Sequence, residues 1–274
     1  MKTDVKLEVP EAERKVVTIK PTDTVIELTE QIAERADRIY GGGVDPHIDN
    51  MLKVTGDGKK LALDPRCIDP MMADENDSKL NYCAENVFEE WQSSAEIKGT
   101  QLVFCDLSTP KKAYSDYEYG KDFDAYNDLK HKLVERGIPE EQIAFIHDAN
   151  TDKQKQDLFD KVNAGTIRVL IGSTEKCGAG TNVQKRLVAL HHLDAPYRPR
   201  DFTQRDGRGI RQGNMNKSVR IYTYATERTF DSYSYQILEN KQRFISQIEK
   251  GDMTVREADD IDETTLSYAE IKAI

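Results

Sequence analysis

From residue 78 onward, apolar positions alternate between the spacing of amphipathic helices and the short runs of buried strands. They predict helices over about 80–95, 123–137, 151–165 and 229–250, and strands over about 101–107, 142–147, 167–171, 187–193 and 219–225. Helices between short, nearly continuous apolar strands imply right-handed crossovers and a mostly parallel sheet covered by helices on both faces. The pattern therefore predicts an α/β fold, with its chemistry at the carboxyl ends of the strands.

The residues before this region follow no such alternation. Residues 1–20 predict a frayed lead-in, and the helical spacing after them predicts one amphipathic helix over about 23–40. Turn signals between residues 44 and 78 predict an irregular connection and no second core. We therefore expect three parts: an N-terminal helical and irregular extension at 1–74, an α/β domain at 75–250 and an acidic, partly disordered C-terminal tail at 251–274.

Composition narrows the class of protein. The chain has 274 residues, 38% hydrophobic and 32% charged, which suffices for one real core with a wide polar surface. No apolar run approaches the roughly 20 residues that cross a bilayer, and the first residues lack the apolar region of a signal peptide. We expect a cytoplasmic protein that neither enters a membrane nor is secreted.

The charged and metal-binding residue types are unevenly distributed. The four cysteines lie far apart and the five histidines add no ligand pattern, so neither a zinc site nor a disulfide framework is predicted. A formal net charge of -10 argues against coating nucleic acid by bulk attraction, but it leaves room for a local basic groove. Residues 198–220 hold seven arginines and lysines against two aspartates, so this basic segment needs an explanation.

Within the basic segment, Arg208 and Arg211 lie three residues apart, so in a helix both guanidinium groups would leave the same face. Arginine offers a planar fork of donors that fits phosphate oxygens and stays charged at any working pH. An exposed basic helix would explain a bare arginine pair, but glycines at 207, 209 and 213 each cost a helix about 1 kcal/mol. That cost favours close approach of this backbone to a ligand or to a neighbouring domain.

A second candidate segment follows the strand expected to end near residue 171. Ser173, Thr174, Gly178 and Gly180 are small or hydroxylated, and at a strand's carboxyl end they can offer N–H and O–H donors to phosphate or sugar. A Walker A loop requires G-x-x-x-x-G-K-[ST], and the sequence contains none. The principal cradle for ATP phosphates is therefore missing from this chain.

Several motifs in this order and spacing match one family: Ser173-Thr174 with Gly178, Gly180 and Asn182, then Asp194–Pro199, Gln204–Gly213, Val219–Tyr224 and Thr229. They resemble motifs V and VI and their flanks in superfamily-two helicases, most closely the Swi/Snf-type DNA translocases. Gln101–Asp106 resembles the motif IV strand, so the resemblance covers about 75–250 and implies a RecA-like domain. More loosely, Asp49–Lys53 and Lys60–Pro65 resemble large helicase and methylase-associated proteins of bacterial mobile elements and phages.

The resemblance implies the C-terminal RecA-like half of an ATP-dependent DNA helicase or translocase. Its partners would be DNA, in duplex form, and an N-terminal RecA-like domain that holds most of the ATP and Mg²⁺, so this chain alone would be inactive and bind neither. The implied roles are catalytic arginine fingers at Arg208 and Arg211, an ATP interface at Gln204, Gly207 and Gly180, and DNA binding at Ser173, Thr174 and Gly178, with no metal ligands. The sequence departs from the family pattern at Glu175, Lys176, Cys177 and Thr181.

Two alternatives remain. The chain could be a non-catalytic RecA-like module that docks DNA or a protein partner. A self-sufficient nucleotide enzyme is disfavoured because the P-loop is absent.

Three further features have simpler explanations. Asp74–Asp77 spells D-E-x-D, the acidic motif that holds magnesium, but no buried strand precedes it, so we expect an acidic linker that caps the next helix. His191 and His192 should lie at a strand end, one ring inward and one outward, and not on a metal. Tyr222 and Tyr224 should share one strand face and pack there.

Overall fold

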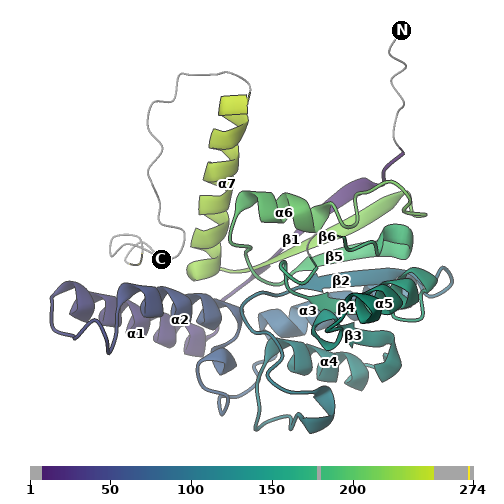
Figure 1. Ribbon diagram of the computed structural model, residues 1–274. Helices are drawn as coiled ribbons and strands as arrows, with labels where there is room; N and C mark the ends of the chain where they lie inside the picture. The colour runs from purple at the N-terminus through teal and green to yellow at the C-terminus, as the bar shows by residue number, and fades with distance from the viewer. Residues whose placement is uncertain (1–7, 178–179, 250–270, 272–274) are drawn as a thin grey trace.

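The computed structural model describes residues 8–177, 180–249 and 271, and its centre is one parallel sheet (Figure 1). Six strands lie in the order β1-β6-β5-β2-β4-β3, and every pair is parallel. The strands are β1 (Glu11–Ile19), β2 (Thr100–Phe104), β3 (Ile143–Phe145), β4 (Val169–Gly172), β5 (Leu187–His192) and β6 (Ser218–Thr226). The predicted parallel α/β sheet is confirmed.

Helices connect and cover these strands. They are α1 (Asp23–Tyr40), α2 (Met51–Leu63), α3 (Lys79–Ser93), α4 (Ala125–Glu135), α5 (Asp152–Ala164), α6 (Pro199–Asp206) and α7 (Phe230–Glu249). Short 3-10 turns lie at Pro65–Cys67, Tyr114–Asp116, Glu140–Gln142, Ile146–Asp148 and Gln184–Arg186. Local signals explain several boundaries. Thr151 forms the predicted cap of α5, in a capping box with Gln154, and Gly165 ends this helix with φ +75°.

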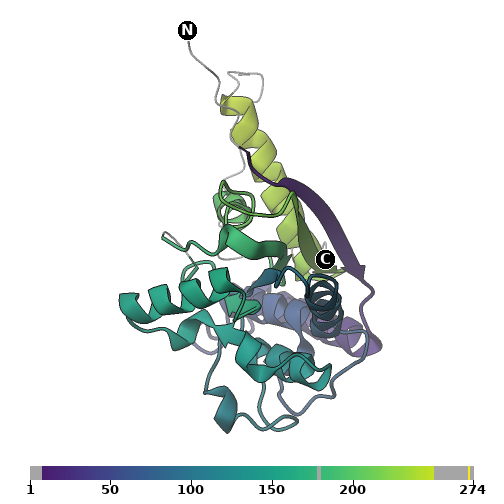
Figure 2. The same cartoon turned by 90° about the vertical axis from the view of Figure 1, so that its right-hand side faces the viewer.

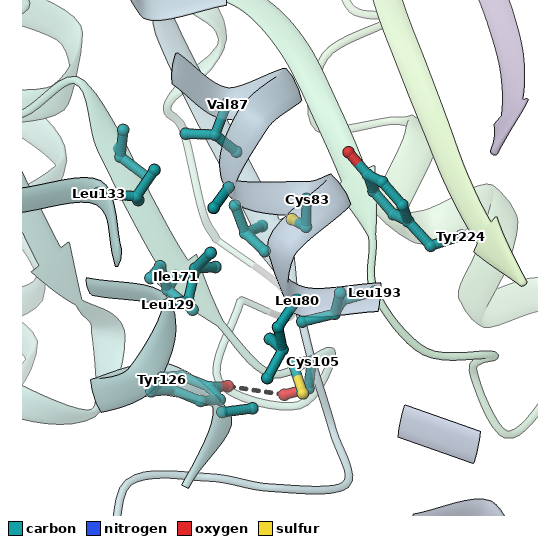
Figure 3. Packing of buried hydrophobic residues seen from close by; sticks show 14 of the residues in the cluster. Leu80, Cys83, Val87, Cys105, Tyr126, Leu129, Leu133, Ile171, Leu193 and Tyr224 are labelled. Atoms are coloured by element: carbon teal, nitrogen blue, oxygen red, sulfur yellow. Dashed lines mark hydrogen bonds between the residues drawn. The ribbon is translucent and has the colours of Figure 1, made fainter. Parts of the chain in front are cut away.

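Two apolar clusters pack on the two faces of the sheet. On one face, α3 and α4 contribute Leu80, Cys83, Val87, Leu129 and Leu133, which pack on Ile171 and Tyr224 of the strands (Figure 3). On that face the hydroxyl of Tyr126 donates to the carbonyl oxygen of Cys105 at 2.7 Å. On the other face, Phe159 and Val162 of α5 pack with Leu102, Leu170 and Leu190. The strands are therefore buried on both sides, as their unbroken apolar runs predict.

Residues 11–19 form a strand, so the expected frayed lead-in is wrong over this range. β1 pairs with β6 from Glu11 opposite Ser218 to Ile19 opposite Thr226. Most of its side chains are exposed because β1 is an edge strand, and charged residues are tolerated there. A charged, exposed edge strand has no alternation of apolar and polar residues, so the sequence pattern does not predict it.

The expected irregular connection over 44–78 is also wrong in part, because it contains α2. The structure has the small core that the sequence did not predict, formed between α1, α2 and the base of α7 by Ile32, Ala36, Val54, Leu61, Ala62 and Phe230, with Ile271. Figure 1 shows α1 and α2 side by side, and Figure 2 shows α7 extending past the sheet. The division near residue 75 stays a prediction, and the tail at 251–274, Ile271 excepted, lies outside the described residues.

The acidic linker Asp74–Asp77 joins these parts through polar contacts. Asp74 accepts from Lys132 of α4 and lies 3.0 Å from Arg66, and Glu75 accepts from Thr24 of α1 at 2.7 Å. The cap of α3 is Ser78 and not an acidic residue. Within the described residues, no helix combines the length and the apolar character needed to cross a membrane.

Candidate functional site

The carboxyl ends of three neighbouring strands bring polar residues to one edge of the sheet. Asp106 follows β2, Ser173 and Thr174 follow β4, and Asp194 follows β5. A groove of about 660 Å³ opens at this edge, and Asp106, Ser173, Thr174 and Gln204 are among its lining residues. The parallel sheet thus places the hydroxylated segment beside the α6 region, as the strand order requires.

Arg208 and Arg211 lie beyond the end of α6, in consecutive turns, so they do not share a helix face. Both nevertheless reach the glycine-bearing segment. Nη1 of Arg208 donates to the carbonyl oxygen of Thr181 at 3.4 Å, and Nη1 of Arg211 donates to Oδ1 of Asn182 at 2.8 Å. Over the described part of the chain, neither guanidinium has a carboxylate within 4.0 Å.

The electrostatic setting of Arg208 differs from that of a surface arginine. Burial, with the nearby charge of Arg211, lowers its pKa from the usual value, although arginine remains protonated at any working pH. Its Nε atom is buried and has no hydrogen-bond partner among the described residues. The half-buried guanidinium keeps its charge without a carboxylate partner in the described structure, so it can bind an additional anion such as a phosphate oxygen.

Glycine is required in this region for two different reasons, close packing at one position and a left-handed backbone at another. A Cβ on Gly209 would lie 2.9 Å from Cδ2 of Leu187 and 3.2 Å from Cγ1 of Val219. The close approach at this position is therefore to the domain's own sheet, and the expected approach to a ligand or neighbouring domain is wrong there. Gly180 has φ +92°, a left-handed conformation that favours glycine, while Gly207 ends α6 with an ordinary φ of -62°.

Arg205 is the charged residue that the sequence reading missed. Its side chain is 0% exposed, and its guanidinium reaches Thr174, Asp106 and Asp194. Asp194 is also fully buried, and its Oδ2 accepts from the backbone N–H groups of Asp106 and Leu107 at 2.5 and 2.9 Å. A sequence signal existed, because carboxylates after adjacent parallel strands meet at one edge and need a nearby cation when buried.

Both histidines of β5 are buried, so the expected outward ring is wrong: β5 lies inside the sheet and both of its faces are covered. His191 contacts the hydroxyl of Tyr224 at 2.9 Å and Oε1 of Gln101 at 3.0 Å. Burial lowers the pKa of His191 to about 3, so its ring is neutral. Tyr222 and Tyr224 share a face and stack near this ring, which confirms their expected packing role.

The predicted site residues fall into two groups. Ser173, Thr174 and Gln204 line the groove. Arg208 and Arg211 meet the segment after Gly180 instead, and Gly207 leads into their turns. Gly178 lies outside the described residues. The structure thus has a groove at the carboxyl ends of the strands and, separately, an arginine pair against Thr181 and Asn182, and the roles of these residues stay predictions.

Comparison with known proteins identifies this region. Residues 98–213 match the family described as the helicase conserved C-terminal domain. The chain carries a helicase C-terminal domain. The groove residues and both arginines fall within the matched part of this RecA-like domain.

Two relatives extend the comparison of this helicase domain. Defense against restriction protein B of Escherichia phage P1 is 33% identical over 103 residues, which are 36% of this chain; the chain spans only 5% of that protein's length. The crystal structure of the C-terminal part of the Fun30 ATPase domain aligns with a TM-score of 0.60 at 12% identity, covering 97% of this chain and 96% of that one. At that identity, the second likeness shows a shared fold.

Proposed function

We propose that the chain is the C-terminal RecA-like half of an ATP-dependent DNA translocase of the Swi/Snf type, from a bacterial mobile element or phage. Arg208 and Arg211 carry this proposal, because both guanidinium groups reach the segment after Gly180 and have no carboxylate partner in the described structure. Two such cations can neutralise charge on a phosphoryl group during transfer. The phage relative and the fold of the Fun30 fragment support the assignment.

In this proposal the ATP site is shared between two domains. An N-terminal RecA-like domain holds Mg²⁺ and most of the ATP, since this sequence has no Walker A loop. The bound nucleotide supplies the phosphoryl group that is hydrolysed. This chain's arginines neutralise the charge on its γ-phosphate, and Gln204, Gly207 and Gly180 border the same interface. The chain is inactive alone, and the complete motor works in the cytoplasm.

DNA occupies the groove at the carboxyl ends of the strands in this proposal. Ser173 and Gly178 follow the DNA backbone in our proposal. Thr174 lines the same groove, but its hydroxyl proton is bound to Asp106 at 2.7 Å, so the backbone contact that the resemblance implies is left to its neighbours. Lys176 lines the groove and supplies a cation, while Asp106, Glu175 and Asp201 line the same groove with carboxylates. We propose tracking along duplex DNA without strand separation, by analogy with the Swi/Snf-type translocases.

ATP hydrolysis with the missing half supplied tests the proposal. The chain is mixed with its N-terminal RecA-like half, and the ATPase rate is measured with and without duplex DNA for wild type, Arg208→Ala and Arg211→Ala. Arginine fingers contribute about 10³ to 10⁵ in rate, so either substitution should nearly abolish turnover. Arg200→Ala is the matched control, because that side chain is 79% exposed in the same basic segment.

The outcomes discriminate between the candidate functions. Absence of DNA stimulation in wild type, or unchanged rates in both arginine variants, would contradict the motor and favour a non-catalytic docking module. ATP turnover by the chain alone would instead indicate a self-sufficient nucleotide enzyme.

A further inference from the structure

Arg205 joins the ends of three strands through one guanidinium group. Its Nε donates to Oγ1 of Thr174 at 2.7 Å and its Nη1 to the carbonyl oxygen of Asp194 at 2.9 Å. Its Nη2 donates to Oδ2 of Asp106 at 2.8 Å and to Oδ1 of Asp194 at 3.1 Å. The side chain also lies over the ring of Phe104, 5.3 Å from the ring centroid. All three nitrogens of this guanidinium are hydrogen-bonded, so the group cannot shift without breaking at least one of these bonds.

The hydroxyl group of Thr174 both donates and accepts within this network. Oγ1 of Thr174 donates to Oδ2 of Asp106 at 2.7 Å while it accepts from Arg205, and the backbone N–H of Thr174 donates to Oδ1 of Asp106 at 2.6 Å. The hydroxyl proton is therefore used inside the protein. Asp106 lines the groove and 31% of its side chain is exposed. Its carboxylate therefore exposes the hydrogen-bond network of Arg205, Thr174 and Asp106 to the groove.

Charge neutralisation alone does not require this arrangement. The carboxylate of Asp194 is fully buried and could neutralise Arg205 by itself through the bond between Oδ1 and Nη2, while Nη1 donates to the Asp194 carbonyl oxygen. The remaining bonds, from Nε and Nη2, go to Thr174 and Asp106, which both line the groove. These bonds hold Thr174 and Asp106 in place relative to α6. Stabilising the buried charge of Arg205 would not require them.

Arg205 also connects directly to the arginine pair. It is the next-to-last residue of α6, and its carbonyl oxygen accepts from the backbone N–H of Arg208 at 3.1 Å. The guanidinium that binds Thr174 and Asp106 therefore belongs to the residue whose backbone is bonded to the turn that carries Arg208. The path from the groove to Arg208 runs through packed, hydrogen-bonded groups without a gap.

We propose that Arg205 is a positioning residue: it couples occupancy of the groove, sensed at Asp106 and Thr174, to the placement of Arg208 and Arg211. The inference rests on the proposed function, because it assigns the groove to DNA and the arginine pair to ATP. Arg205 touches neither ligand in this scheme. Thr174 acts through its internal bonds, and its side chain makes no contact with the DNA.

The test separates stimulation by DNA from basal hydrolysis. In the reconstituted pair of halves, Thr174→Val and Arg205→Lys should each lower the DNA-stimulated ATPase rate about tenfold and leave the basal rate within about twofold of wild type. Thr109→Val is the matched control, because Thr109 lines the same groove and has no bond to Arg205. The double variant should lose no more stimulation than the worse single variant, because both substitutions break one network.

Other results would overturn the inference. Equal proportional losses of basal and stimulated rates would make Arg205 a purely structural residue, and additive losses in the double variant would mean that the two residues act separately. Thr174→Val leaves every buried charge in place, so it tests the inference even if Arg205→Lys fails to fold. If wild type is stimulated, Arg208→Ala is inactive and Thr174→Val is still stimulated, only this inference fails. If wild type itself is not stimulated, the proposed function and the inference both fail.

Discussion

His192 and Asp206 form a buried hydrogen bond of 2.8 Å between Nε2 and Oδ1, which joins the end of β5 to the last residue of α6. Burial raises the pKa of Asp206, but the bonds from His192 and Arg14 outweigh it and hold the pKa below its usual value. Burial lowers the pKa of His192, so a neutral ring donates to an ionised carboxylate. This bond anchors the helix that precedes Arg208.

We predict that Asp206→Ala destabilises the protein by about 1–3 kcal/mol, because it leaves a ring N–H of His192 buried without an acceptor. Arg14 also binds Asp206, at 2.6 Å, but its side chain is 56% exposed. Arg14→Ala should therefore cost at most about 1 kcal/mol. Urea unfolding of both variants, followed by circular dichroism, measures the difference. An equal or larger loss for Arg14→Ala would contradict the anchoring role of the histidine bond.

A second prediction concerns pH and rests on His191. Its folded pKa of about 3 lies below the ordinary value of 6.5, so between these values the unfolded chain binds a proton that the folded chain does not. The free energy of unfolding should therefore fall as pH drops below 6.5, and His191 alone accounts for about 2 kcal/mol at pH 5. Above pH 7 its contribution is constant.

The variant His191→Gln isolates this effect. Burial raises the pKa of Asp128 to about 6, which acts in the opposite direction over the same range, so the total pH dependence mixes several groups. Urea unfolding at pH 7.5 and pH 5 should show a smaller loss on acidification for the variant than for wild type. The same loss in both proteins would mean that His191 does not titrate as a buried neutral ring.

Much of the fold was predictable because its signals are local. The helix expected over 23–40 is observed at those positions, with Thr22 as its cap, and α5 begins after Thr151 and ends before Gly165 as expected. Buried parallel strands such as β4, and β5 up to Leu190, are apolar runs, so the sequence predicts each strand without reference to its neighbours.

The elements that escaped prediction depend on distant partners. β1 is charged and exposed, and only its pairing with β6 makes it a strand. α2 contains two glycines that read as a turn, and its helical state depends on packing against α1 and Phe230. At the candidate site, Arg205 and Arg208 look alike in sequence. Only the positions of Asp106 and Asp194 make one a buried connector and leave the other without a carboxylate partner in the described structure.

A third prediction concerns the buried charge cluster around Arg66. This guanidinium binds Asp64 and Asp128, each at 2.8 Å, and lies 3.0 Å from Asp74, with only 6% of its side chain exposed. Arg66→Ala leaves buried carboxylates without their cation and should destabilise the protein by about 3–5 kcal/mol. The exposed pair of Lys121 and Glu118 provides the control, because Lys121→Ala should cost at most about 1 kcal/mol.

Thermal unfolding of the Arg66 variant also bears on the domain boundary. The cluster joins the expected N-terminal extension to Asp128 of α4, so the two parts should lose stability together, in a single transition. Two transitions, only one of which shifts in Arg66→Ala, would show that the parts unfold independently.

The two glycines of α2 give a matched pair of substitutions with opposite expected signs. A Cβ on Gly58 would lie 2.4 Å from the ring of Phe230, which is 1% exposed, whereas a Cβ on Gly56 would meet nothing within 4 Å. Gly58→Ala should destabilise the protein by about 1–3 kcal/mol through overpacking. Gly56→Ala should stabilise it by up to about 1 kcal/mol, because alanine favours the helix. The midpoints of urea unfolding measure both effects. If both alanines stabilise the protein, α2 does not pack against the base of α7, and the small core between α1, α2 and Phe230 does not exist as described.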